Sequence, residues 1–142
     1  MGQRVWILQD NLIESLSDKL AQEGVDSVWD WRVDSHEDPI ARGDVVLLWQ
    51  PSADGDAAAA CAIAEIIRPA FYSPNEKTNF LFNLKIRKVF ETPITRNEIR
   101  RAMPGSQQEP LIMRKNRGRI IARLTDQQWE VIRSLRPELQ EI

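Results

Sequence analysis

The sequence has little of what catalysis and metal binding usually require: it contains one cysteine, Cys61, and one histidine, His36. A single cysteine excludes a disulfide within the chain and a zinc site built from several cysteines. Cys61 also lies in an apolar, alanine-rich run, where a thiol is expected to be packed and unreactive. The adjacent residues His36, Glu37 and Asp38 seldom converge on one ion. We therefore expect no enzyme, no metal and no cofactor.

Long apolar runs and clustered glycines are also missing. No stretch approaches the roughly 18 apolar residues of a membrane span, and no signal-peptide pattern is present, so we expect a cytoplasmic protein without a membrane partner. The 6 glycines are scattered and form no phosphate-cradling loop. A length of 142 residues, 42% of them hydrophobic, predicts one globular domain over residues 1–142.

The charges are unevenly distributed along the chain, although the formal net charge is only -2. Residues 1–83 carry 6 basic and 14 acidic side chains, whereas residues 84–123 carry 11 basic and 3 acidic ones. Such a division can produce one positive face for a phosphate backbone, or a solvated surface on which the two signs interleave. The candidate phosphate contacts are Lys85, Arg87, Arg114, Lys115, Arg117 and Arg119.

Apolar and alternating patterns predict six or seven strands. Alanine favours helix in the run 57–68, but its isoleucines and the tight turn before it favour a strand that pairs with its neighbour. Residues 68–78 contain two prolines and are expected to form a loop. The predicted strands are 4–9, 27–33, 45–50, 57–68, 79–90, 110–114 and 118–124.

Three helices are predicted over residues 10–24, 92–105 and 125–137. Near its start, each range contains a residue that can cap a helix, with a Glu or Gln three places further on. These pairs are Asn11/Glu14, Thr95/Glu98 and Thr125/Gln128. Together the elements predict a mixed α+β fold, with a small curved sheet or open barrel of about six strands and three peripheral helices.

The segment from Ser27 to Pro51 holds three of the five tryptophans and the only histidine. Aromatic side chains can stack on a flat ligand, and nearby polar side chains can read its edge. Core packing is the alternative for any tryptophan, and we assign Trp6 and Trp129 to the core. The candidate ligand residues are Gln9, Trp29, Trp31, Ser35, His36, Trp49 and Gln50.

Several motifs in order resemble the EVE domain of the PUA-like superfamily, in the variety associated with modification-dependent restriction systems. They are "ILQDN", "WDWRV", "GDVVLLW", "KVFETPITRNEIR" and "LTDQQWEVI", and they extend from about Val5 to Leu135. The resemblance implies a PUA-like pseudo-barrel that binds nucleic acid, with a modified base flipped into an aromatic pocket.

By that resemblance, Trp29, Trp31, Ser35, His36 and Trp49 line or rim the pocket, with Gln9 nearby. The implied ligand is DNA with 5-methylcytosine or 5-hydroxymethylcytosine, and an implied partner is a restriction endonuclease or another defence protein. Two alternatives stay open. One is binding of a modified RNA. The other is a protein-interaction module with a degenerate pocket, because the run "AAAACA" stands where this variety typically has glycines.

Overall fold

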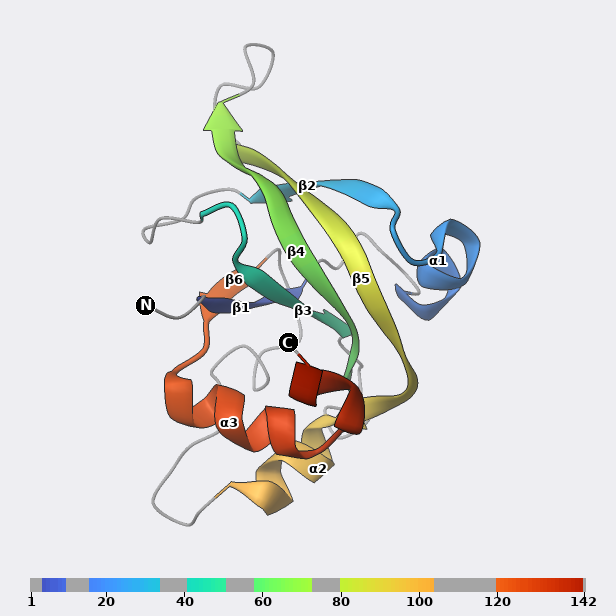
Figure 1. Ribbon diagram of the computed structural model, residues 1–142, viewed down its shortest axis with the longest axis vertical. Helices are drawn as coiled ribbons and strands as arrows, with labels where there is room; N and C mark the ends of the chain where they lie inside the picture. Colours follow the sequence, from blue (N-terminus) through green and yellow to red (C-terminus); the bar gives the residue numbers. More distant parts are fainter. Residues whose placement is uncertain are drawn as a thin grey trace.

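The computed structural model describes residues 4–9, 16–33, 41–50, 58–72, 80–103 and 120–141. Within them, six strands form one sheet in the order β2-β5-β4-β3-β1-β6, and helices lie on both sides of it (Figure 1). The elements in chain order are β1 (Val5–Gln9), α1 (Leu16–Glu23), β2 (Val28–Val33), β3 (Val45–Gln50), β4 (Ala59–Tyr72), β5 (Phe80–Thr95), α2 (Arg96–Ala102), β6 (Ile120–Arg123), α3 (Asp126–Ser134) and the 3-10 helix η3 (Pro137–Glu141).

The parallel pair β1 and β3 lies inside the sheet, in register from Val5 opposite Val45 to Gln9 opposite Trp49. All five residues of β1 and the first five of β3 are buried. A strand that is covered on both faces has no polar alternation, which is why "VWIL" and "VVLLW" read as unbroken apolar runs. The other described pairings in the sheet are antiparallel.

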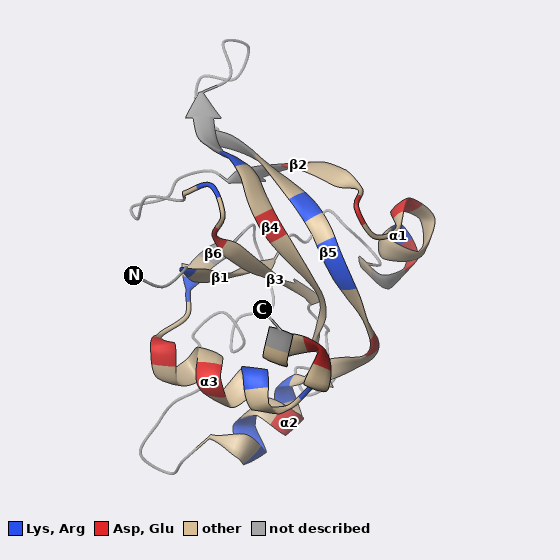
Figure 2. Cartoon of the chain, viewed as in Figure 1, with Lys and Arg blue, Asp and Glu red and all other residues tan. Residues whose placement is uncertain are grey.

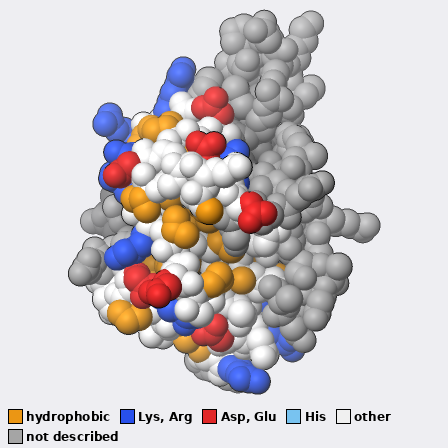
Figure 3. All heavy atoms as spheres, turned by 90° about the vertical axis from the view of Figure 1, so that its right-hand side faces the viewer, with side chains coloured by type: hydrophobic (Ala, Val, Ile, Leu, Met, Phe, Trp, Pro, Cys, Tyr) orange, Lys and Arg blue, Asp and Glu red, His pale blue; other side chains and the backbone are white. Residues whose placement is uncertain are grey.

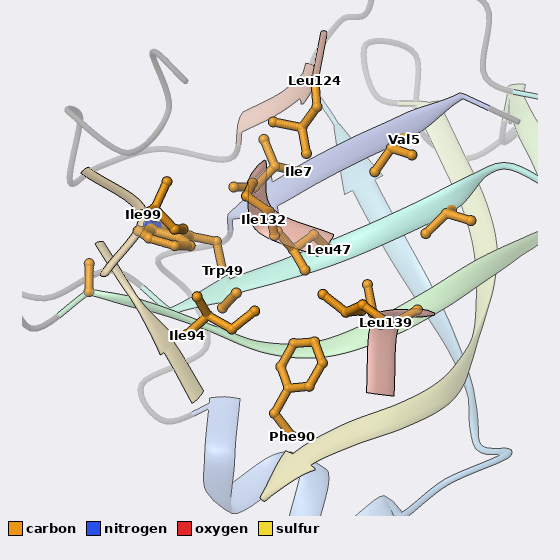
Figure 4. Close-up of a cluster of buried hydrophobic side chains, with 14 residues drawn as sticks. Val5, Ile7, Leu47, Trp49, Phe90, Ile94, Ile99, Leu124, Ile132 and Leu139 are labelled. Carbon is orange, nitrogen blue, oxygen red and sulfur yellow. The ribbon is translucent and has the colours of Figure 1, made fainter. Parts of the chain in front are cut away.

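Alternation along the strands divides the core into two clusters on opposite faces of the sheet. The first cluster places Trp6, Leu8 and Leu48 against α1 and β2. The second lies under α2, α3 and η3 (Figure 4), and it includes Val5, Ile7, Leu47, Trp49, Phe90, Ile94, Ile99, Leu124, Ile132 and Leu139. The expected core position of Trp6 is confirmed at 2% exposure, and Trp129 packs, half-buried, against the second cluster.

The hairpin of β4 and β5 contributes to both clusters, and its pairing register shifts at several points. At the largest shift, Ala60 lies opposite Ile94 while Ala62 lies opposite Val89, so β5 carries extra residues there and bends. Cys61 lies at this bulge and is 4% exposed. The strand predicted in the alanine-rich run is confirmed.

The loop predicted over residues 68–78 is wrong in its first part, because β4 continues to Tyr72, opposite Phe80. Proline cannot donate to a strand ladder and is tolerated mainly at edges and bulges. Pro69 stands where the register shifts between Arg68 and Phe71, so the strand passes through it.

The helix starts at Thr95 and Thr125 are confirmed as capping boxes. In each box the threonine side chain accepts from the backbone N–H three residues on, and that residue's side chain accepts from the threonine N–H. The first helix is described from Leu16, so its predicted cap residues Asn11 and Glu14 lie outside the described residues. None of the described helices is long and apolar enough to cross a membrane.

Arg136, which follows α3, ties the C-terminal part of the chain to β5 and α2. Its guanidinium donates to the carbonyls of Thr92 and Pro93, at 3.0 and 2.9 Å, and to both carboxylate oxygens of Glu98, at 2.8 and 2.9 Å. The hydrogen bond from Arg136 is the main reason that the pKa of Glu98 lies below its ordinary value of 4.5. The same carboxylate completes the Thr95 capping box, so one ion pair fixes both helix packing and a helix start.

Replacing Arg136 by lysine should lower the free energy of unfolding by about 1–3 kcal/mol, because an ammonium cannot reproduce the planar fork of donors. The lowered pKa of Glu98 means that its contribution is complete above about pH 4.5 and is lost as the pH falls through the folded pKa. Urea unfolding from pH 7 to pH 3 should therefore show a wild-type advantage that shrinks in acid. The control R101K, at an exposed position on α2, should behave as wild type; equal losses in both variants would contradict the assignment.

Candidate nucleic-acid interface

Asp44 fixes the entry to β3, beside the loop that carries two of the candidate ligand residues. Its carboxylate Oδ2 accepts from the indole N–H of Trp6 at 3.0 Å and from the backbone N–H of Ala41 at 2.9 Å, and the residue is 5% exposed. Gly43 makes the turn with a φ of 92°, in the left-handed region that glycine tolerates. The chain that leaves β2 is therefore held again at Ala41, so the intervening loop has a fixed return point.

Trp29 belongs to the first core cluster and is only 4% exposed. Its indole N–H donates to the Ser27 hydroxyl at 3.0 Å, and the ammonium of Lys19 lies 4.7 Å from the centre of the ring. Such a cation–π contact and the hydroxyl partner satisfy the ring within the fold. A base could stack on Trp29 only if α1 moved away.

Trp49 and Gln9 lie opposite each other at the ends of β3 and β1, on the sheet face of the second core cluster. Trp49 is 1% exposed and Gln9 is fully buried. The indole N–H of Trp49 has no hydrogen-bond partner among the described residues, although a buried donor normally has one. Both residues therefore have the surroundings of a core rather than of an open pocket.

Gln50 lies one residue beyond Trp49 and so faces the opposite side of the sheet. Its side-chain carbonyl accepts from the backbone N–H of Leu16, the first residue of α1. Gln50 supplies an acceptor, from across the fold, for a backbone N–H of α1. The residue predicted to read a ligand thus holds α1 against β3.

The candidate ligand residues therefore divide between the two faces of the sheet. Trp29 and Gln50 belong to the face of α1, whereas Gln9 and Trp49 belong to the face of α2 and α3. Trp31 is placed on β2 by its pairing with Phe82. Ser35 and His36 lie outside the described residues. The role of these residues in binding stays a prediction, but Trp29 and Trp49 do not meet in one pocket.

Two of the six candidate phosphate contacts lie on β5, and both have acidic partners. The ammonium of Lys85 is 3.8 Å from a carboxylate oxygen of Asp26, and Arg87 forms an ion pair with Glu65 on β4. Figure 2 shows an acidic position on β4 beside basic positions on β5, and Figure 3 shows basic and acidic side chains interleaved on the face that is turned to the viewer. The remaining four candidates, Arg114, Lys115, Arg117 and Arg119, lie outside the described residues.

A hollow of about 360 Å³ lies where β6 leads into α3, and its described lining is Arg123 to Asp126. Since β6 and β2 form opposite ends of the strand order, this hollow is remote in the sheet from Trp29 and Trp31. No group of three or more potential metal ligands gathers among the residues that the structure describes.

Sequence reasoning missed two residues that organise this region, Asp44 and Arg136. The signal for Asp44 is the pair Gly43-Asp44 directly before a buried strand, because an acidic residue at such a position must find buried donors. Nothing near Arg136 in the sequence points to Glu98, 38 residues earlier.

Comparison with protein families matches the EVE domain model to residues 4–135. Among solved structures, the chain is similar to a hypothetical protein from Leishmania major, with 14% identity, a TM-score of 0.68 and 98% of each chain covered. A protein from Rhodopseudomonas palustris has 21% identity and a TM-score of 0.61 over 91% of this chain and 90% of that one. No curated protein matches in a search by sequence.

The human THYN1 protein, solved in complex with DNA that contains 5-methylcytosine, has 12% identity and a TM-score of 0.66, with 94% of this chain and 97% of that chain covered. At these identities the likeness shows a shared fold. The expected α+β, PUA-like fold is therefore confirmed: an open, curved six-stranded sheet with helices on both faces.

The burial of Trp49 predicts a structural role that can be measured without a ligand. Trp49→Ala should reduce the free energy of unfolding by about 3–5 kcal/mol, as large-to-small changes in a core do. The exposed Val25→Ala, at 53% exposure, is the matched control and should cost less than about 0.5 kcal/mol. Urea denaturation checks both, and a Trp49→Ala variant as stable as wild type would show that the residue is not part of the core.

Proposed function

The chain belongs to the EVE domain family, and we propose that it is a non-catalytic reader that binds a modified base of the 5-methylcytosine or 5-hydroxymethylcytosine type in nucleic acid. The observation that carries this proposal is the fold shared with human THYN1 over 94% of the chain, because that protein is known in complex with 5-methylcytosine DNA. The single histidine and the buried Cys61 support a binding role rather than catalysis.

A base that leaves the stack loses the stacking energy of its neighbours, and an aromatic pocket compensates for that loss. In this proposal Trp31 is the stacking platform, and Ser35 and His36 read the edge of the base. Trp31 lies on β2 two residues beyond Trp29, opposite Phe82 on β5. The anchor at Asp44 supports the role of the loop, because it holds the chain that returns from Ser35 and His36.

Four of the candidate residues then hold the walls of the proposed pocket in place and do not contact the ligand, namely Trp29, Trp49, Gln9 and Gln50. Trp29, Trp49 and Gln9 are buried, and the Gln50 side chain accepts from the N–H of Leu16 in α1. These contacts fix the strand ends around the proposed pocket. Phosphate contacts fall mainly to Arg114, Lys115, Arg117 and Arg119. Lys85 and Arg87 contribute less in this proposal, because Asp26 and Glu65 already compensate their charges.

Modified DNA is the preferred ligand because the THYN1 complex contains it. A modified RNA is the second candidate, since flipping a base out of a strand uses the same stacking in both nucleic acids. The proposed partner is a restriction endonuclease or another defence protein. A reader of this kind would bring the nuclease to nucleic acid that carries the modified base.

Trp31→Ala should remove the preference for modified cytosine over cytosine, because it weakens the modified oligonucleotide by about 5- to 150-fold if the flipped base stacks on the ring. An unmodified base that stays in its strand makes no such contact and should be weakened less. Fluorescence anisotropy with matched labelled oligonucleotides, containing cytosine, 5-methylcytosine or 5-hydroxymethylcytosine, measures both losses. The control Trp31→Phe keeps an aromatic face and should retain part of the preference. Equal weakening for all three bases in Trp31→Ala would remove Trp31 from the pocket.

Arg117→Ala should weaken modified and unmodified oligonucleotides alike and should reduce the slope of log affinity against log salt by about one. Lys85→Ala is the contrast, because its charge already has an acidic partner, and it should change both quantities less. The same anisotropy titrations, repeated at several salt concentrations, test both variants. If the wild-type protein does not distinguish modified from unmodified DNA and binds RNA more tightly, the RNA candidate is favoured. If it binds neither DNA nor RNA, both candidates are overturned.

A further inference from the structure

Helix α2 is the most basic of the helices that the structure describes. Its 7 residues, "RNEIRRA", include Arg96, Arg100 and Arg101, against one acidic residue, Glu98. Helices α1 and α3 each contain one basic and two acidic residues. Figure 2 shows the basic positions along α2 and the single acidic position among them. The positive charge of residues 84–123 that the sequence shows is therefore concentrated, in the described part, on one short helix.

The one acidic residue of α2 is neutralised from outside the helix. Both carboxylate oxygens of Glu98 accept from the guanidinium of Arg136, at 2.8 and 2.9 Å. The Arg136 side chain is only 14% exposed, so this pair is partly shielded from solvent. The negative charge of Glu98 is thus compensated at the start of the helix and does not offset the arginines further along it.

The arginines near the end of α2 lie on its outward side. Ile99 is fully buried in the second core cluster and marks the side that faces the sheet. Successive residues of a helix turn by about 100°, so Asn97 and Arg101, two residues before and after Ile99, lie nearly opposite it. Asn97, Arg100 and Arg101 are all exposed. This surface presents an amide and two guanidinium groups, which can all donate to phosphate oxygens.

The position of α2 connects this surface with the segment between α2 and β6, to which the proposed function assigns most phosphate contacts. Helix α2 starts at the carboxyl end of β3, because the N–H of Arg96 donates to the carbonyl of Ala58, directly before the part of β4 that pairs with Gln50. Strand β6 starts at the same end of the sheet, since Ile120 is paired with Gln9, the last residue of β1. Both ends of the segment therefore lie near α2.

We propose that the outward surface of α2, formed by Asn97, Arg100 and Arg101, binds the phosphate backbone of the nucleic acid, in continuation of the segment between α2 and β6. The proposal rests on the proposed function in one respect, that the ligand is a nucleic acid. Helix α3 packs beside α2 but lies off this path, because its exposed Asp126 and Glu130 repel phosphates.

The distance between α2 and β2 sets the length of ligand that can reach both. Strand β5 runs from Phe80, opposite Val33 at the end of β2, to Thr95 at the start of α2 (Figure 1). Its 16 residues span at most about 50 Å. A duplex rises by about 3.4 Å per base pair, so a ligand that reaches from Trp31 to α2 needs up to about 15 base pairs.

The test compares duplexes of about 20 and about 7 base pairs, each with one modified cytosine near one end. Fluorescence anisotropy at low temperature and several salt concentrations measures binding. On the long duplex, Arg100→Ala and Arg101→Ala should each weaken binding by about 5- to 10-fold at about 0.1 M salt and lower the slope of log affinity against log salt by about one. The double variant R100A/R101A should lower the slope by about two. On the short duplex all three should stay close to wild type.

Matched variants separate the charge of α2 from its fold. Arg101→Lys keeps the charge and should retain most of the affinity for the long duplex. Asn97→Asp adds a negative charge to the outward surface and should weaken that binding. Lys85→Ala is the control, because its charge already has Asp26 as a partner, and it should change affinity and slope less. Thermal unfolding checks that each variant is folded, as expected for exposed positions.

The preference for modified cytosine, measured on the short duplex, tests the proposed function separately. If that preference is absent while the α2 variants still weaken the long duplex, the proposed function fails and the role of α2 stands. Wild-type affinity and salt slope of R100A/R101A on the long duplex overturn the role of α2. Equal losses on both duplexes overturn it too, because α2 then does not bind a backbone that extends beyond the pocket. A wild-type protein that binds neither duplex overturns both proposals.

Discussion

The parallel pair of β1 and β3 is the constraint on which the rest of the structure depends. Every residue from Val5 to Gln9 and from Val45 to Trp49 is buried, so both faces of this pair must be covered. One helix cannot do this, and the chain therefore places α1 on one face and α2, α3 and η3 on the other. Since parallel strands end at the same edge, Gln9 at the end of β1 lies beside Trp49 near the end of β3.

Buried polar groups then decide how the covering parts are attached. Asp44 lies at the start of β3 with the indole N–H of Trp6 and a backbone N–H as its partners, and an unpaired carboxylate there would be strongly destabilising. Arg136 does the same at the other end of the fold, where it joins Glu98 to two carbonyls of β5. Apolar burial thus sets which face each helix covers, and these polar contacts set where it sits.

Local signals in the sequence predicted much of the fold, because strand alternation and capping boxes act over a few residues. The boxes at Thr95 and Thr125 and the strand in the alanine-rich run were all readable in this way. The tertiary placement of the tryptophans could not be predicted from such local signals. Trp29 and Trp49 stand close in the sequence, yet the pairing of their strands with β5 and β1 puts them on opposite faces. The loop predicted after Arg68 failed because a bulge accommodates a proline that would otherwise end the strand.

The attachment of α1 by the side chain of Gln50 has a consequence for the order in which the chain acquires its structure. The boxes of α2 and α3 lie within each helix's own first turn, whereas α1 is held at Leu16 by a residue 34 positions further along the chain. An isolated helix of this length is marginal in water. The chain must therefore close a long loop and assemble β3 before α1 gains its stabilising contact. We expect α1 to form late in folding, and its amide hydrogens to exchange with solvent earlier than those of the strands.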